Sequence, residues 1–132
     1  MAFKSKIKTV EDAFNYTGKD IAVLAAFKKL PNDDRDYMVA AYKRSVVTEA
    51  LNKEANKGKT WKPDWTDGTW KYQSYVWLKK ADGGVGFVVA GTHYDDAATG
   101  THCGSRLCFK TSELVDYFNE QFADLLQVTM AE

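Results

Sequence analysis

The stretch NDDRDYMVAAYKRSVVTEALNKEANK, residues 32–57, decides the fold because it is the longest segment of the chain with helical features. It begins with Asn32 and three aspartates. Such residues are favoured at a helix start, where they accept hydrogen bonds from free N–H groups and oppose the helix dipole. Apolar residues then recur at helical spacing, and Gly58 is a typical terminator. We therefore expect one long central helix from residue 32 to about residue 57.

Two shorter helices are predicted before it. Thr9, which is followed by acidic residues, is a good N-terminal cap, and Gly18 can end this first helix. Asp20 can cap a second short helix that runs to Leu30, where the following proline ends it. Residues 1–8 alternate lysine with apolar or small residues, which is typical of a mobile arm or an edge strand.

After the long helix the pattern becomes that of strands. Thr69–Lys79 alternates in polarity, and Val85–Ala90 follows it across the turn signal Asp82-Gly83-Gly84. A loop is expected from residue 91 to residue 101. Arg106–Lys110 is then short enough to be a third strand. These segments predict an antiparallel meander of three strands.

A final helix is predicted at the C-terminal end, with Thr111 or Ser112 as its cap. Its apolar residues recur at helical spacing, so one face should close over the sheet. These residues are Leu114, Phe118, Phe122, Leu125 and Leu126. The predicted fold class is therefore α+β in a single domain, residues 1–132, with N-terminal helices, a three-stranded antiparallel meander and a C-terminal packing helix.

The composition is that of a globular protein. The chain has 132 residues, of which 45% are hydrophobic, and its formal net charge is zero. A neutral chain is a poor candidate for gripping phosphate backbones over its whole surface. Residues 1–80 nevertheless carry 16 basic against 10 acidic side chains, and residues 81–132 carry 2 against 8. This asymmetry can steer an anionic partner or support head-to-tail assembly. It has neither effect if the two halves pack together and their opposite charges cancel.

Cysteine usage and hydropathy indicate the setting. Cys103 and Cys108 are too few for a disulfide framework and too far apart for a CxxC motif, which favours a reduced, cytoplasmic protein. No apolar run approaches the ~18 residues that a membrane span needs. The lysine-containing start has no apolar signal-peptide core behind it. We expect no membrane partner.

The most distinctive segment is aromatic and basic. All four tryptophans lie between residues 61 and 77, and seven lysines lie between residues 53 and 80. Trp and Tyr are favoured anchors of protein interfaces, and Trp interleaved with Lys also suits base stacking beside phosphates. In a third interpretation most of the rings are core, with lysine stems covering their edges. The candidate binding residues are Trp61, Lys62, Trp65, Lys71, Tyr75 and Trp77.

No motif in the chain has the spacing of a catalytic or metal site. Five possible metal ligands lie close together in sequence: His93, Asp95, Asp96, His102 and Cys103. Their spacing fits no standard zinc pattern. Gly104-Ser105-Arg106 lacks the pattern of a nucleophile elbow, and the glycines at 83–86 lack the lysine of a phosphate loop. We therefore predict a non-enzymatic protein with no catalytic residue, no metal and no cofactor.

Two sequence blocks resemble a known family. They are WKPDW at residues 61–65 and GSRLCFKT at residues 104–111, with Lys71-Tyr72 between them and Glu113-Leu114 and Gln121-Phe122 after them. In these blocks the chain is similar to a family of small uncharacterised proteins from bacteriophages and prophage-like elements of gut Bacteroidetes. The resemblance spans the long helix to the C-terminal helix and implies no particular activity. It favours a host-takeover factor, a DNA-transaction accessory or a small virion component over a metabolic enzyme.

The leading hypothesis is a phage-type binding module that contacts a protein partner, or another copy of itself, through residues 61–77. The setting would be the host cytoplasm or a virion. One alternative is an accessory single-stranded nucleic-acid-binding protein, whose affinity would fall steeply with salt. Another is a small virion structural protein.

Overall fold

The computed structural model describes residues 4–66, 70–81, 84–95 and 105–131, with side chains at 4–66, 70–74 and 106–130. This part of the chain is mostly helical and has one antiparallel hairpin. The elements, in chain order, are α1 (Val10–Thr17), the 3-10 helix η1 (Ile21–Lys29), α2 (Asn32–Ala55), β1 (Lys71–Ala81), β2 (Gly84–Asp95), the 3-10 turn η2 (Ser105–Leu107), α3 (Ser112–Gln121), α4 (Ala123–Leu126) and the π-helical turn η3 (Gln127–Ala131).

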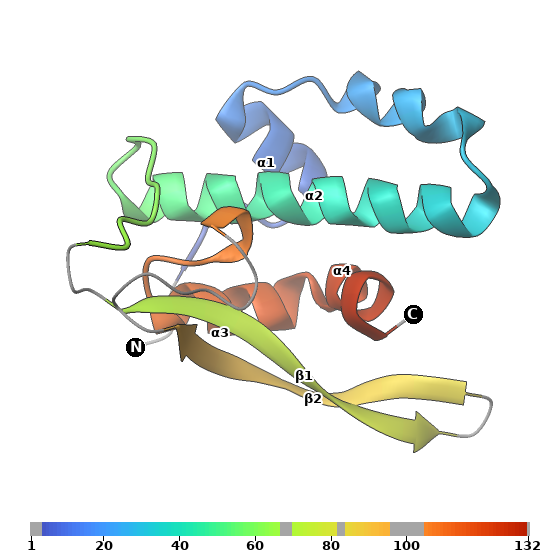
Figure 1. The fold of residues 1–132 in the computed structure, drawn as a ribbon. Helices are drawn as coiled ribbons and strands as arrows, with labels where there is room; N and C mark the ends of the chain where they lie inside the picture. Colours follow the sequence, from blue (N-terminus) through green and yellow to red (C-terminus); the bar gives the residue numbers. More distant parts are fainter. Residues whose placement is uncertain (1–3, 67–69, 82–83, 96–104, 132) are drawn as a thin grey trace.

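Helix α2 is the central element, as predicted. Its 24 residues span about 36 Å at 1.5 Å per residue. In Figure 1, α1 and η1 lie on one side of α2, α3 and α4 lie on the other, and the hairpin lies beyond α3. The predicted cap is wrong in detail, because Pro31 occupies the N-cap position and Asn32 is the first helical residue. The Asn32 side chain instead accepts a 2.8 Å hydrogen bond from the Arg35 guanidinium.

Helix α1 begins and ends at the residues that the sequence predicts. Thr9 and Asp12 form a capping box, in which the side chain of each accepts a 3.1 Å hydrogen bond from the backbone N–H of the other. Gly18 ends α1 with φ +77°, a conformation that a side chain disfavours. Asp20 caps the next helix, which is η1 rather than an α-helix. Residues 4–8, expected as an arm or edge strand, contact the core, where Ile7 is 2% exposed.

The hairpin is longer than the sequence predicts. Strands β1 and β2 pair antiparallel from Lys71 opposite Asp95 to Ala81 opposite Gly84, with one irregularity after Trp77. Strand β2 thus continues to residue 95, where a loop from residue 91 was expected. The predicted turn residues at 82 and 83 lie outside the described part of the chain.

The third predicted strand, Arg106–Lys110, does not form a strand. Its first residues belong to η2, and only Phe109 makes a bridge, to Tyr72 of β1, with N–O distances of 3.1 and 2.7 Å. The segment therefore borders β1, whereas a meander would place it beside β2. The physical reason is Asn52 of α2. Its side-chain amide donates to the Cys108 carbonyl at 2.9 Å and accepts from the Lys110 N–H at 2.8 Å, so a helix side chain occupies the place of a neighbouring strand.

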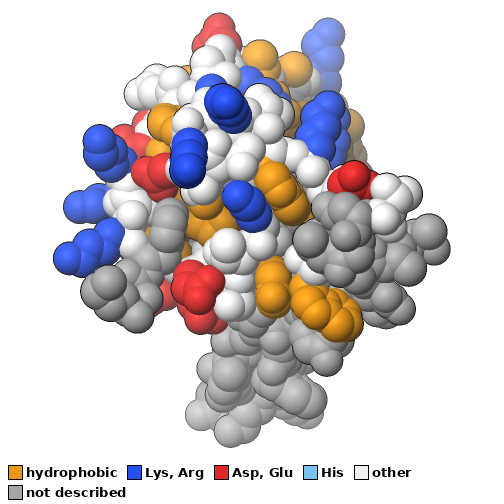
Figure 2. All heavy atoms as spheres, turned by 90° about the vertical axis from the view of Figure 1, so that its left-hand side faces the viewer, with side chains coloured by type: hydrophobic (Ala, Val, Ile, Leu, Met, Phe, Trp, Pro, Cys, Tyr) orange, Lys and Arg blue, Asp and Glu red, His pale blue; other side chains and the backbone are white. Residues whose placement is uncertain are grey.

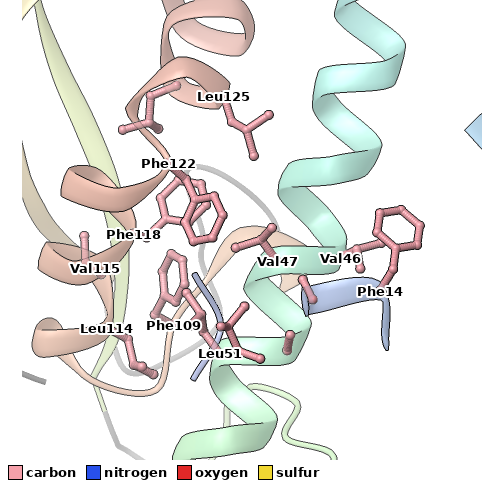
Figure 3. Packing of buried hydrophobic residues seen from close by; sticks show 14 of the residues in the cluster. Phe14, Val46, Val47, Leu51, Phe109, Leu114, Val115, Phe118, Phe122 and Leu125 are labelled. Carbon is pink, nitrogen blue, oxygen red and sulfur yellow. The ribbon is translucent and has the colours of Figure 1, made fainter. Parts of the chain in front are cut away.

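The core lies mainly between α2 and the C-terminal helices. In Figure 3, the rings of Phe109, Phe118 and Phe122 gather between these elements, and Val47 and Leu51 of α2 approach them. The ring centroid of Phe118 lies 5.5 Å from that of Phe109 and 5.7 Å from that of Phe122. All five apolar residues predicted for the final helix are buried. As predicted, α3 covers the sheet, because it contacts both β1 and β2, and Figure 3 shows that the C-terminal helices also pack against α2. Each such side chain contributes about 1.5–3 kcal/mol through burial.

Helix α2 also buries a polar line that the sequence does not reveal. Arg44, Thr48 and Asn52 follow one another at intervals of four residues, and each is at most 5% exposed. The Arg44 guanidinium donates to the Thr129 hydroxyl at 3.2 Å and lies 6.0 Å from the centroid of the Phe118 ring. The polar line therefore ties α2 to the C-terminal turn at one end and to the segment after η2 at the other.

Candidate binding site

A pocket of about 410 Å³ opens at the C-terminal end of α2, between that helix, the loop after it and η2. We call it the Trp61 pocket. It is lined by Lys19, Ser45, Glu49, Asn52, Thr60, Trp61, Lys62, Pro63 and Arg106. Figure 2 views the molecule from this end, where Lys and Arg side chains stand around an area that includes exposed hydrophobic side chains.

The loop that carries Trp61 is held by the end of α2. Gly58, with φ +81°, turns the chain away from the helix, and its N–H donates to the carbonyl of Lys53 at 2.9 Å. The Asn56 side chain then donates to the Lys59 carbonyl at 3.1 Å and to that of Thr60 at 3.4 Å. These bonds fix the two residues that precede Trp61.

The opposite wall is held by the same helix. Asn52 binds the backbone on both sides of Phe109, as described above, which fixes the segment directly after Arg106. One turn later, Asn56 accepts a 3.2 Å hydrogen bond from the Lys110 ammonium. Two asparagines of α2 therefore position both walls of the Trp61 pocket.

The charge of the pocket is positive. Lys19 and Glu49 form an ion pair at 3.1 Å, and their side chains are 34% and 39% exposed, so the pair adds little stability but largely neutralises itself. Lys62 and Arg106 are exposed, and neither forms an ion pair with any residue that the structure describes. Two positive charges thus remain available at the rim.

The pocket also has an apolar wall and neutral hydrogen-bonding groups. Trp61 and Pro63 are half-buried, so part of each ring still faces solvent. Ser45 and Thr60 add hydroxyl groups that can donate or accept. The arrangement suits a ligand group that combines an apolar surface with negative charge, because Arg and Lys beside an aromatic ring can bind both parts.

The six predicted site residues divide into three pairs. Trp61 and Lys62 line the pocket. Trp65 and Lys71 contact each other instead, because the Lys71 ammonium lies 5.2 Å from the Trp65 ring centroid and Lys71 is fully buried. This contact excludes Lys71 from any binding surface. The side chains of Tyr75 and Trp77 lie outside the described residues, although their backbones pair with Gly91 and Val89 in the hairpin.

Three charged residues of the pocket were missed by sequence reasoning. Arg106 was assigned to a strand, and Lys19 and Glu49 come from positions 30 residues apart. No local pattern links these residues to Trp61, so only the fold brings them together.

Among the described residues, no group of three or more His, Cys, Asp or Glu side chains is placed to hold a metal ion. Of the possible ligands named above, Asp96, His102 and Cys103 lie outside these residues, and His93 and Asp95 are described only by their backbone in β2. In the same part of the chain, no helix combines the length and apolar character needed to cross a bilayer.

Comparison with known proteins adds no relative. No family model matches the chain, and neither the curated proteins nor the solved structures contain a significant match.

Proposed function

We propose that the protein is a non-enzymatic binding module that contacts a protein partner through the Trp61 pocket. The observation that carries this proposal is the composition of the pocket, in which the half-buried rings of Trp61 and Pro63 stand beside the exposed cations Lys62 and Arg106. Trp and Arg are the residues most enriched among the energetic hot spots of protein interfaces. Loop residues held rigidly by a helix lose little entropy on binding.

The partner presents an acidic segment with an apolar or aromatic side chain. Arg106 can hold a carboxylate through two parallel N–H···O bonds, and Lys62 adds a second charge nearby. The apolar side chain of the partner packs on Trp61 and Pro63. Charge attraction accelerates the encounter, and the aromatic contact slows dissociation.

Single-stranded nucleic acid is the second candidate, supported by the same tryptophan and cations. It is the weaker one, because the Lys71 ammonium covers one face of Trp65 and is itself buried. One ring for stacking and one lysine for phosphate contact are thereby withdrawn from the predicted surface. The phage-like sequence blocks support a setting in the host cytoplasm or in a virion, which the proposal includes.

The proposal is tested by copurification from a gut Bacteroidetes host that produces the tagged chain. Four forms are compared: the wild type, Trp61→Ala, the double variant Lys62→Glu/Arg106→Glu, and the control Lys4→Glu/Lys8→Glu, which reverses two exposed lysines before α1. Circular dichroism of each purified form confirms folding. Retained proteins and nucleic acids are quantified at low and high salt, and a retained protein is then purified and titrated against all four forms.

The expected result is a defined protein that the wild type and the control bind equally and that both pocket variants lose. Retention of oligonucleotides with the same dependence on the pocket would replace the protein proposal by the nucleic-acid one. If all four forms retain the same set of molecules, the Trp61 pocket is not the binding site.

A further inference from the structure

A second surface stands out at the other end of α2. Among the described residues, six large hydrophobic side chains are exposed, and five of them lie between positions 21 and 38. They come from η1, from the turn after it and from the first turns of α2. These residues are Ile21, Val23, Leu30, Tyr37 and Met38. We call this surface the η1–α2 corner. Exposed apolar side chains on a small protein commonly mark an interaction site where they lie beside a hollow, as Tyr37 does.

The part of this corner at the start of α2 is acidic, although Lys28, Lys29 and Arg35 balance the charge of residues 21–38 as a whole. Asp33, Asp34 and Asp36 are exposed, and together with Tyr37 and Val128 they line a hollow of about 450 Å³. Asp36 lies 3.9 Å from the Arg35 guanidinium, whereas the other two aspartates form no ion pair with a described residue. Lys28 and Lys29, at the end of η1, are not part of this hollow.

Helix capping does not account for the corner as a whole. Aspartates in the first turn of a helix stabilise it by opposing the helix dipole, which explains the acids. It does not explain why Tyr37, which lines the same hollow, is 49% exposed, nor why Val23 of η1 is 44% exposed. A partner with apolar surface and positive charge would cover both features.

The Trp61 pocket has these properties. It combines the rings of Trp61 and Pro63 with the exposed cations Lys62 and Arg106. Its α2 residues lie between Ser45 and Asn52 and those of the corner between Asp33 and Met38, so the two sets are centred about 20 Å apart along a single helix. Figure 1 shows the loop that follows α2 at one end of this helix and the turn that precedes it at the other. Because the helix holds these two segments apart, one copy cannot bring its own Tyr37 to its own Trp61.

We propose that the partner of the Trp61 pocket is the η1–α2 corner of a second copy of this chain. The inference rests on the proposed function and names its partner. Tyr37 of one copy packs against Trp61 of the other, and Asp33 and Asp34 meet Lys62 and Arg106. If a twofold axis relates the two copies, the contact forms twice and closes a pair. Any other rotation makes the contact heterologous and gives a closed ring or an open chain.

Charge-reversal variants test this pairing in the purified full chain. Mass is measured by light scattering and sedimentation over a wide concentration range at low and high salt. The wild type is expected to exceed the monomer mass of 14.9 kDa as concentration rises, and salt should weaken the association. Arg106→Glu and Asp34→Lys should each weaken it about tenfold or more. Glu120→Lys, an exposed reversal on α3, is the control and should leave it unchanged.

The decisive form carries Arg106→Glu and Asp34→Lys together, because the reversed charges then attract again. Recovery of association in this double variant would support the direct pairing. The inference is overturned if the folded wild type keeps the monomer mass at every concentration in low salt, or if the reversals leave its association unchanged. A monomeric wild type that still loses a foreign protein partner in the pocket variants would overturn only this inference and leave the proposed function standing.

Discussion

Replacing Asn52 by alanine is predicted to lower the free energy of unfolding by about 3 kcal/mol. The Asn52 side chain is 4% exposed and makes two hydrogen bonds of good length, to the Cys108 carbonyl at 2.9 Å and from the Lys110 N–H at 2.8 Å. Alanine leaves both backbone groups without this partner at the wall of the Trp61 pocket. Each unsatisfied group costs about 1–3 kcal/mol, and the exposure of Lys110 places its share at the low end.

The assay is urea unfolding followed by circular dichroism, with the midpoint and the slope fitted separately. Asn56→Ala is the matched control, because it removes an asparagine at the C-cap of α2. Its bonds to Lys59 and Thr60 lie at the surface, and its bond from Lys110 comes from the side-chain ammonium and leaves no backbone group unpaired. It should cost less than about 1 kcal/mol. Asn52→Ala should also loosen the wall that carries Arg106. Equal and small losses in the two variants would refute the role given to Asn52.

Three further predictions concern stability and use the same unfolding assay. Phe118→Ala should cost about 3–5 kcal/mol, because the ring is fully buried between two others, and a loss below about 1 kcal/mol would contradict the core described above. Gly18→Ala should cost about 1 kcal/mol through the left-handed backbone alone, since an added Cβ meets no atom within 4 Å; no loss would disprove that cause. Asp12→Asn should reduce the dependence of stability on pH. The N–H of Lys8, which donates to the Asp12 carboxylate, lowers the pKa of that group. The stabilisation is thus complete above the ordinary Asp pKa of about 3.9 and is lost as pH falls through the lower folded value. Identical pH profiles for the variant and the wild type would exclude this linkage.

The helices could be predicted because their signals are local. Thr9 and Gly18 mark the ends of α1 by hydrogen bonding and backbone conformation alone, and both act within a few residues. The third strand could not be predicted in the same way. Whether a short segment pairs as a strand depends on what lies beside it, and here Asn52, more than 50 residues earlier, binds the backbone on both sides of Phe109.

In the candidate site, too, local sequence patterns identify some residues, and only the fold brings the others together. The density of tryptophan and lysine indicated a segment in which Trp61 and Lys62 line a pocket. Alternation along β1 predicted that Lys71 would share a face with Gln73, but it could not show that this face is covered, and both residues are buried. Arg106 reaches the pocket only through the packing of η2 against α2, which no sequence pattern encodes.

The central claim is that the Trp61 pocket binds a protein. Its most direct test is photo-cross-linking from a benzoylphenylalanine placed at position 62 in the full chain, compared with the same group at position 120, an exposed residue of α3. The cross-linked products are identified by mass spectrometry in the producing cell. A discrete protein adduct is expected from position 62, either a foreign protein or a second copy of the chain. This adduct should disappear when Arg106→Glu is added and should be absent from position 120. Equal yields from both positions, or an adduct that Arg106→Glu leaves intact, would contradict the claim.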